Sequence, residues 1–172
     1  MARLEIKTAD QLMAMDPKHR GARWAGRQTT LLRQILRAFA DRGGPIPVSE
    51  IVAASAEFPA ELTYEALAAL DRDHLIRASE GGVDIAYPFC AIPTRFTVHL
   101  PAGHRRHACC AIGALGVAPM LGRPVGIRAR CHHCDEALEL SAGPQGLKPG
   151  AGGVMLWIGR RGEAGGKMID SL

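Results

Sequence analysis

Four of the five cysteines lie close together in the sequence, at spacings that suit a soft metal ion. Cys131 and Cys134 form a Cys-x-x-Cys motif, and twenty residues separate Cys131 from Cys110, which follows His107 by three positions. Two sulfurs in one tight turn can bind one soft ion, and a tetrahedral site needs two further ligands. We therefore predict a metal site of Cys110, Cys131, Cys134 and His107, with the adjacent Cys109 as an alternative ligand.

The Cys-x-x-Cys motif leaves several interpretations open. A bound ion could be a resident Zn²⁺ or a captured Hg²⁺ or Cu⁺, since thiolates favour all three. Alternatively, the motif is an ordinary turn with His132 and His133 in solvent. A thiol-redox protein is less favoured, because redox motifs usually open a helix after a strand, whereas CHHCDEALEL resembles a turn between strands.

Cys109 and Cys110 precede a predicted helix of small residues, ACCAIGALGVAPMLG, and are the candidate catalytic thiols. The positive end of a helix dipole favours a thiolate, and the nearby Arg105 and Arg106 add to this effect. Neighbouring residues point in different directions, so we expect one of the two cysteines to pack in the core. Cys90 is predicted to be a buried packing residue.

Length and composition restrict the class of protein that positions these thiols. A chain of 172 residues with 47% hydrophobic residues can form one large domain or two small ones. No apolar run reaches the length of a membrane span, and the N-terminus lacks a signal-peptide core, so we expect a cytoplasmic protein. Composition leaves the oligomeric state open.

In the first half of the chain, the sequence pattern predicts a winged helix-turn-helix at residues 27–88, after an N-terminal extension at 1–26. Helical spacing predicts a helix that Thr29 or Thr30 caps, and PIPVSEIVAAS predicts a second helix that Ser49 caps. A third helix follows in FPAELTYEALAALDRDHLI, and LIRASEGGVDIAY predicts two strands about a Gly-Gly turn.

The third helix is poorly suited to reading DNA. A recognition helix carries cations and amides towards phosphates and base edges. This helix carries Glu61, Glu65, Asp71 and Asp73 against Arg72. Because acidic side chains repel the phosphate backbone, DNA is a disfavoured partner and the unit is predicted to be a scaffold.

In the second half of the chain, residues 89–172, the sequence pattern predicts a small α+β unit that carries the cysteines. It is the basic half, with ten Lys and Arg against five Asp and Glu. Strands are predicted at 94–100, 124–130, 137–140 and 153–159, and the stretch between the last two is predicted to be a turn-rich loop.

The segment RRHACCAIGALGVAPMLGRPVGIRARC, residues 105–131, resembles the organomercurial (alkylmercury) lyase family. Its most specific parts are the Cys-Ala-Ile start at Cys110 and the Leu-Gly-Arg end at 121–123. The helical stretch PVSEIVAASAEFPAEL fits the N-terminal domain of the family more loosely, and the resemblance covers residues 28–158.

The resemblance implies an α+β fold and a reaction that needs no cofactor. In the family, the cysteine that opens the helix binds the mercury of an R–Hg⁺ compound, and Cys110 matches it. A carboxylate three residues later helps to move a thiol proton to carbon. The carbon–mercury bond then breaks, and Hg²⁺ stays on the thiolates. An organometal or a soft metal ion is the implied partner.

Two departures from the family pattern weaken the expected activity. Gly113 occupies the carboxylate position, and the sequence ends at MIDSL, about where the second active-site cysteine of the family would begin a further strand. Cys131 matches a structural cysteine of the family, whereas Cys109 and Cys134 are extra thiols that could replace the lost one. We expect weak cleavage with tight Hg²⁺ retention. The alternative is a non-catalytic zinc, mercury or copper module, or a metal-responsive helix-turn-helix regulator.

Overall fold

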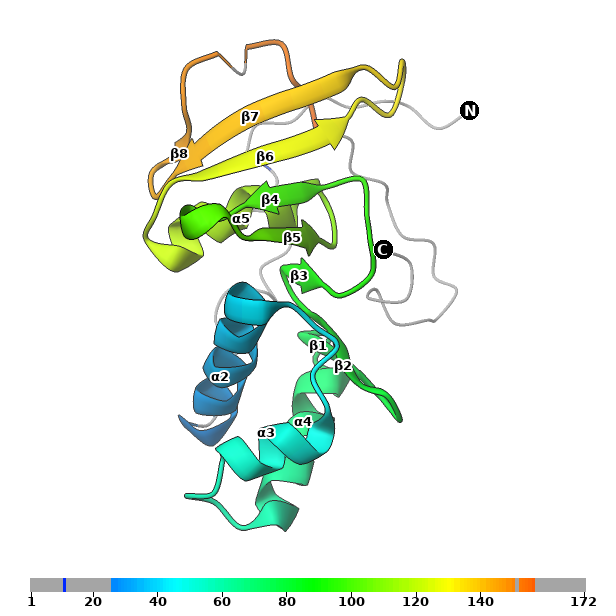
Figure 1. The fold of residues 1–172 in the computed structure, drawn as a ribbon, viewed down its shortest axis with the longest axis vertical. Helices are drawn as coiled ribbons and strands as arrows, with labels where there is room; N and C mark the ends of the chain where they lie inside the picture. The colour runs from blue at the N-terminus through cyan, green and yellow to red at the C-terminus, as the bar shows by residue number, and fades with distance from the viewer. Residues whose placement is uncertain (1–10, 12–25, 151, 157–172) are drawn as a thin grey trace.

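Three helices open the described part of the chain, and each buries one apolar face. The computed structural model describes residue 11, residues 26–150 and residues 152–156. Helix α2 (Gly26–Arg42) places Leu31, Ile35 and Phe39 four residues apart, so they share one side, and all three are buried. Helices α3 (Val48–Ala54) and α4 (Ala60–Arg72) follow, with α4 against α2 (Figure 1).

The predicted helix starts differ from those in the structure. Helix α2 begins at Gly26, before the expected caps Thr29 and Thr30. Pro47, not Ser49, is the N-cap of α3, and no side chain caps that helix. Proline is favoured at helix starts because the first amides have no partner within the helix.

All eight strands of the described residues belong to one antiparallel sheet with the order β1-β2-β3-β5-β4-β6-β7-β8. Strands β1 (Ile76–Ser79) and β2 (Gly82–Ala86) form a hairpin after the helices. This element order agrees with the predicted winged helix-turn-helix, although that assignment remains a prediction. The remaining strands are β3 (Phe89–Cys90), β4 (Thr97–His99), β5 (Arg105–Ala108), β6 (Val125–Arg130), β7 (Ala137–Gly143) and β8 (Gly146–Leu147).

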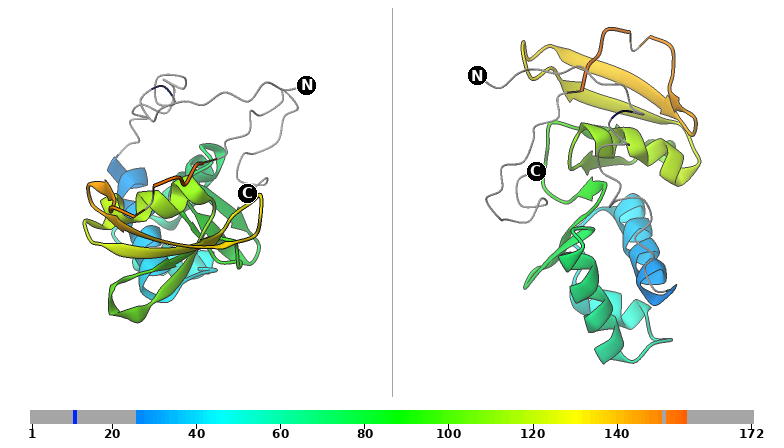
Figure 2. Two further views of the ribbon diagram at one scale, coloured as in Figure 1. Left: turned by 90° about the horizontal axis from the view of Figure 1, so that it is seen from above. Right: turned by 180° about the vertical axis from the view of Figure 1, so that it is seen from behind.

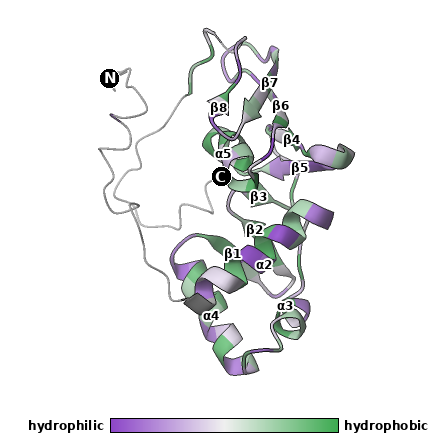
Figure 3. Ribbon diagram, turned by 90° about the vertical axis from the view of Figure 1, so that its left-hand side faces the viewer, coloured by the Kyte–Doolittle hydropathy of each residue, from purple (hydrophilic) through white to green (hydrophobic). Residues whose placement is uncertain are grey.

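Helix α5 (Ala111–Leu121) lies against one face of the second part of the sheet, as the front and back views agree (Figures 1 and 2). The helix contains no charged residue, and it is coloured hydrophobic in Figure 3. It buries Ala114, Val117 and Ala118 in the same core cluster as Val98 and Ile127 of the sheet. The sheet therefore fixes the position of the segment that begins with Cys110.

One hydrophobic core runs through both halves of the chain. Phe39 of α2 and Phe89 of β3 stack with their ring centroids 6.4 Å apart, and both belong to the cluster that contains Val98. The sheet also continues across the predicted boundary, since Ile85 of β2 pairs with Cys90 of β3. The units at 27–88 and 89–172 thus share packing, and their division remains a prediction.

The C-terminal part of the sheet differs from the expectation. Residues 153–156 of the strand predicted at 153–159 are not in a strand. Strand β8 instead lies within the predicted loop and pairs with the end of β7. Apart from residues 11 and 26, the predicted extension at 1–26 lies outside the described residues, and so do residues 157–159 of that predicted strand. No helix in the described ranges is long and apolar enough to cross a membrane.

Candidate functional site

Cys110 is the N-cap of helix α5, and its side chain completes the first turn. Its backbone is extended, with φ −157° and ψ 176°, and its sulfur accepts a hydrogen bond from the Gly113 amide at 3.3 Å. The carbonyl of Cys110 accepts the first helical bond, from the Ala114 amide at 2.9 Å. The sulfur therefore lies at the positive end of the helix dipole, where negative charge is stabilised.

Tyr87 is the second side chain at the Cys110 sulfur. It lies between β2 and β3, where its amide donates to the carbonyl of Leu75 at 2.8 Å. Its hydroxyl is 3.5 Å from the sulfur of Cys110. Burial, together with the neighbouring Cys110 and Cys109, raises the pKa of Tyr87 well above its usual value, so the hydroxyl stays protonated at neutral pH.

Tyr87 was not predicted to be a functional residue from the sequence. The only local signal is its place in Tyr87-Pro88-Phe89-Cys90, between two short strands. That signal says nothing about a residue 23 positions away, because the contact depends on how β3 pairs with β5.

Cys109 packs in the core, as expected for one member of an adjacent pair. Its side chain is 5% exposed, and its thiol donates to the carbonyl of Phe89 at 3.3 Å. Burial, and then the nearby Cys90 and Cys110 thiols, raise the pKa of Cys109 to about 12. Cys109 is therefore a neutral thiol at physiological pH, and a neutral thiol is a weak nucleophile.

Gly113 leaves open the space next to the Cys110 sulfur. A Cβ at this position would lie 3.7 Å from the sulfur and 3.3 Å from the Cβ of Pro88. A side chain at position 113 would therefore adjoin the thiol at the cost of a small shift of Pro88. The side-chain contacts of the sulfur on the described residues thus include a tyrosine and no carboxylate.

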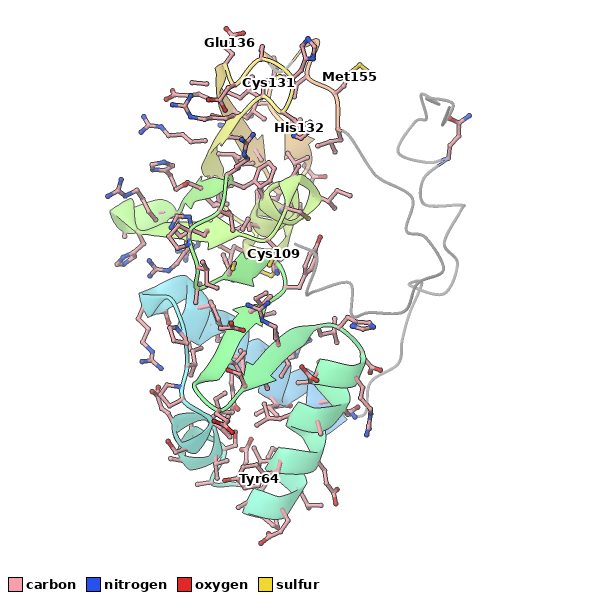
Figure 4. All side chains as sticks on the ribbon, turned by 90° about the vertical axis from the view of Figure 1, so that its right-hand side faces the viewer. Tyr64, Cys109, Cys131, His132, Glu136 and Met155 are labelled. Carbon is pink, nitrogen blue, oxygen red and sulfur yellow. The ribbon has the colours of Figure 1, made fainter. Side chains whose placement is uncertain are left out.

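Cys131 and Cys134 lie on the turn between β6 and β7, away from Cys110. Figure 4 shows Cys131 at the end of the molecule beyond the sheet, whereas Cys109, the neighbour of Cys110, lies near the middle. Hydrogen bonds to the Cys131 sulfur from the amides of Cys134 and His133, and from the Cys134 thiol, lower the pKa of Cys131. Cys134 is exposed.

The predicted ligands do not come together in the described part of the chain. His107 lies on β5, where its Nδ1 accepts from the Thr94 amide at 3.5 Å. Within residues 26–150 and 152–156, no three His, Cys, Asp or Glu side chains are close enough to share a metal ion. Gathering Cys110 with Cys131 and Cys134 around one ion would require a different arrangement of the two segments.

Arg106 is directed to helix α2. Its Nε donates to the carbonyl of Phe39 at 2.6 Å, at the C-terminal end of that helix. A cation stabilises this end of a helix dipole. Arg106 was expected to stabilise a thiolate at Cys109 or Cys110. In the structure it instead makes a contact between the two halves of the chain.

The comparisons with known proteins concern the family and the fold. Residues 89–171 match the family model of alkylmercury lyase. An alkylmercury lyase of Staphylococcus epidermidis is 30% identical over 116 residues, which cover 66% of this chain and 50% of that protein. Residues 89–171 therefore carry an alkylmercury lyase domain, which confirms the family resemblance at residues 105–131.

A solved structure supports the same fold. The crystal structure of the mercury-bound form of MerB2 matches with a TM-score of 0.63 and 23% identity, over 74% of this chain and 61% of that one. The chain thus has the mixed helix and antiparallel-sheet fold of that protein. It spans about half the length of the curated relative that it matches.

Proposed function

We propose that this chain binds organomercury compounds through the sulfur of Cys110 and cleaves their carbon–mercury bond slowly. The observation that carries the proposal is the position of Cys110, with its sulfur at the positive end of α5 between the Gly113 amide and the Tyr87 hydroxyl. Both groups can donate to a thiolate, and a thiolate is the form that binds a soft metal. Membership of the alkylmercury lyase family and a mercury-bound structural neighbour support the choice of metal.

The proposed reaction begins with formation of a sulfur–mercury bond. The Cys110 thiolate displaces a small thiol or halide ligand from R–Hg–X and forms R–Hg–S. A proton is then delivered to the carbon, and the electron pair of the carbon–mercury bond becomes the new carbon–hydrogen bond. The products are R–H and Hg²⁺ bound to thiolates. The reaction consumes a proton and needs no cofactor.

The expected slow step is the delivery of the proton. Efficient general acids have a pKa near the working pH. Two protonated groups near Cys110 are the Tyr87 hydroxyl and the Cys109 thiol, and the pKa of each is raised. Gly113 provides no acid. We therefore expect cleavage to be slow and the Hg²⁺ product to remain on the protein.

A second candidate function is mercury binding without cleavage. Gly113 favours this candidate, because the position that adjoins the Cys110 sulfur has no side chain to move a proton. Both candidates need Cys110 as the mercury ligand. They differ only in whether hydrocarbon is released.

Incubation of the full chain with a phenylmercury compound and excess monothiol tests the proposal. We expect retention of mercury on the protein, measured by mass spectrometry, and slow release of benzene, measured by gas chromatography. Cys110→Ser should abolish benzene release, whereas the control Cys134→Ser removes a thiol elsewhere and should not. Benzene release that persists in Cys110→Ser would refute the proposal, and binding at Cys110 without benzene would establish the second candidate.

A further inference from the structure

The turn that carries Cys131 and Cys134 is held closed at its base. The last pair of β6 and β7 joins Arg130 to Ala137, and the Cys131 amide then donates to the Glu136 carbonyl at 2.8 Å. Inside this closure, the Asp135 amide donates to the carbonyl of Cys131 at 2.9 Å. The backbone around the two cysteines is therefore defined by hydrogen bonds on both sides of the turn.

A side chain supports the same turn. Asp135 has a φ of 58°, in the left-handed region that few non-glycine residues adopt. The Arg130 guanidinium donates to the carbonyl of Asp135 at 2.9 Å and to its carboxylate at 3.1 Å. These bonds stabilise the turn on which both cysteines lie.

The two cysteines lie three positions apart on this closed turn. The amides of Cys134 and His133 and the side chain of Cys134 are near enough to lower the pKa of Cys131. Cys131 is partly exposed and Cys134 is exposed, so an ion can reach both from solvent. Two sulfurs at Cys-x-x-Cys spacing on a tight turn can reach one ion, and the backbone hydrogen bonds of this turn hold the two residues at that spacing.

The pair is separate from the proposed mercury site at Cys110. Cys110 follows β5 and Cys131 follows β6, and β4 lies between these strands. Two strand spacings of about 4.8 Å put β5 and β6 roughly 10 Å apart. Thiolates that share an ion each lie about 2.3 Å from it, so their sulfurs are within about 4.6 Å of each other.

The number of ligands selects the kind of ion. A structural zinc site needs four ligands, and the described residues hold no group of three candidate ligands, even with His132 and His133 beside the pair. Hg²⁺ and Cu⁺ are soft ions that are satisfied by two thiolates in a linear arrangement. An exposed dithiol therefore suits such an ion better than it suits Zn²⁺.

We propose that Cys131 and Cys134 form a second, independent metal site that binds Hg²⁺ as a two-coordinate dithiolate. Two sulfur–mercury bonds form, and the protons of the thiols pass to solvent. No oxidation or reduction takes place. The site does not depend on the proposed lyase activity, because it uses neither Cys110 nor an organic group on the mercury.

Mercury retention in a Cys110→Ser background tests this site separately from the proposed function. In excess monothiol the full chain should keep one Hg²⁺, because the second thiolate of a pair binds within the same molecule. Adding Cys131→Ser and Cys134→Ser should weaken apparent affinity by at least about 100-fold. Adding Cys90→Ser instead, as a thiol-matched control, should leave the bound mercury unchanged, and so should His132→Ala with His133→Ala.

A second measurement uses the unsubstituted chain, in case the variants fold poorly. Maleimide labelling with peptide mass spectrometry should show that Hg²⁺ protects Cys131 and Cys134 together, at the same mercury concentration. Protection of only one of them would overturn the proposal. So would full mercury retention after both serine substitutions, or a Cys131–Cys134 disulfide that persists in the monothiol.

Discussion

The phenolic oxygen of Tyr87 lies 3.5 Å from the sulfur of Cys110, although 23 positions separate the two residues in the chain. This contact gives the thiol a polar neighbour that local sequence around Cys110 does not contain. When Cys110 is a thiolate, the hydroxyl is the donor, because burial and the thiolate itself raise the pKa of Tyr87. Tyr87 is therefore expected to stabilise the sulfur that binds mercury.

Tyr87→Phe tests this role. A hydrogen bond contributes about 1 kcal/mol, so its loss should weaken mercury binding at Cys110 roughly fivefold. The measurement is competition for Hg²⁺ against a small dithiol, in a variant with Cys131→Ser and Cys134→Ser that isolates Cys110. Tyr64→Phe, at the exposed second tyrosine on α4, is the matched control and should have no effect. Equal affinities for the two phenylalanine variants would contradict a role for Tyr87.

Gly113→Asp should increase hydrocarbon release from an organomercurial. The new Cβ would lie 3.7 Å from the Cys110 sulfur, and a carboxylate there can relay a proton. Efficient general acid–base catalysis contributes about 100-fold or more to a rate, so even poor geometry should give an increase of about tenfold. The readout is benzene release from phenylmercury.

Two variants control for the effect of a new side chain or charge on α5. Gly113→Ala adds the Cβ without the carboxylate. Gly116→Asp adds the carboxylate on the same helix, at a position whose Cβ would meet nothing within 4 Å. If either control matches Gly113→Asp, the carboxylate next to the thiol is not the cause.

Substitution of Cys110 by serine and by alanine should distinguish its role as a helix cap from its role as a mercury ligand. Both substitutions remove the thiol and should abolish mercury binding at this site. Serine keeps an acceptor for the Gly113 amide, whereas alanine leaves that amide unpaired and should cost about 1 kcal/mol of unfolding free energy. Urea unfolding measures the difference. Equal stabilities would show that the sulfur does not act as a helix cap.

Cys109 should make folding stability fall at high pH. In the unfolded chain its thiol ionises near its ordinary pKa of 9.0, whereas in the folded chain its pKa is about 12. Between these values the unfolded state binds fewer protons, so the unfolding free energy falls as pH rises, by up to about 1.4 kcal/mol per pH unit. Below pH 9 this contribution is fully present.

The check on this pH dependence is urea unfolding across that window for the unsubstituted chain and for Cys109→Ala. The variant should be less stable overall, because it removes a buried thiol, but its stability should fall less steeply with pH. Tyr87, whose pKa is raised from 10.0, adds its own slope above pH 10 in both proteins, so the difference between the two pH profiles isolates Cys109. Parallel pH profiles would argue against a strongly raised Cys109 pKa.

Phe39→Ala should destabilise the whole described fold, because Phe39 stacks on Phe89 across the two halves. Truncation of a buried phenylalanine costs about 3–5 kcal/mol. A single unfolding transition that shifts as one unit, seen alike by circular dichroism and by alkylation of Cys109, is the expected result. Loss of helix signal at lower urea than exposure of Cys109 would instead indicate two domains that unfold separately.

The local sequence pattern was sufficient to predict the helices, most of the strands and the position of Cys110 at the start of a helix. The spacing of Leu31, Ile35 and Phe39 predicts α2 because an apolar face must be buried, and the structure buries all three. Cys110 at the start of α5 follows from the small-residue run behind it and from the family resemblance. Both are short-range signals, because each depends only on residues that are near in the sequence.

The surroundings of the thiols were decided only by the tertiary structure. Because β3 pairs with β5, Tyr87 comes to Cys110 and Cys109 is buried against Phe89. Because β4 is inserted between β5 and β6, the Cys131 turn leaves the sheet two strands away from Cys110, and the single four-ligand site expected from spacing does not form within the described residues. Strand order depends on which distant segments bury one another's apolar faces, and spacing along the chain does not record that choice.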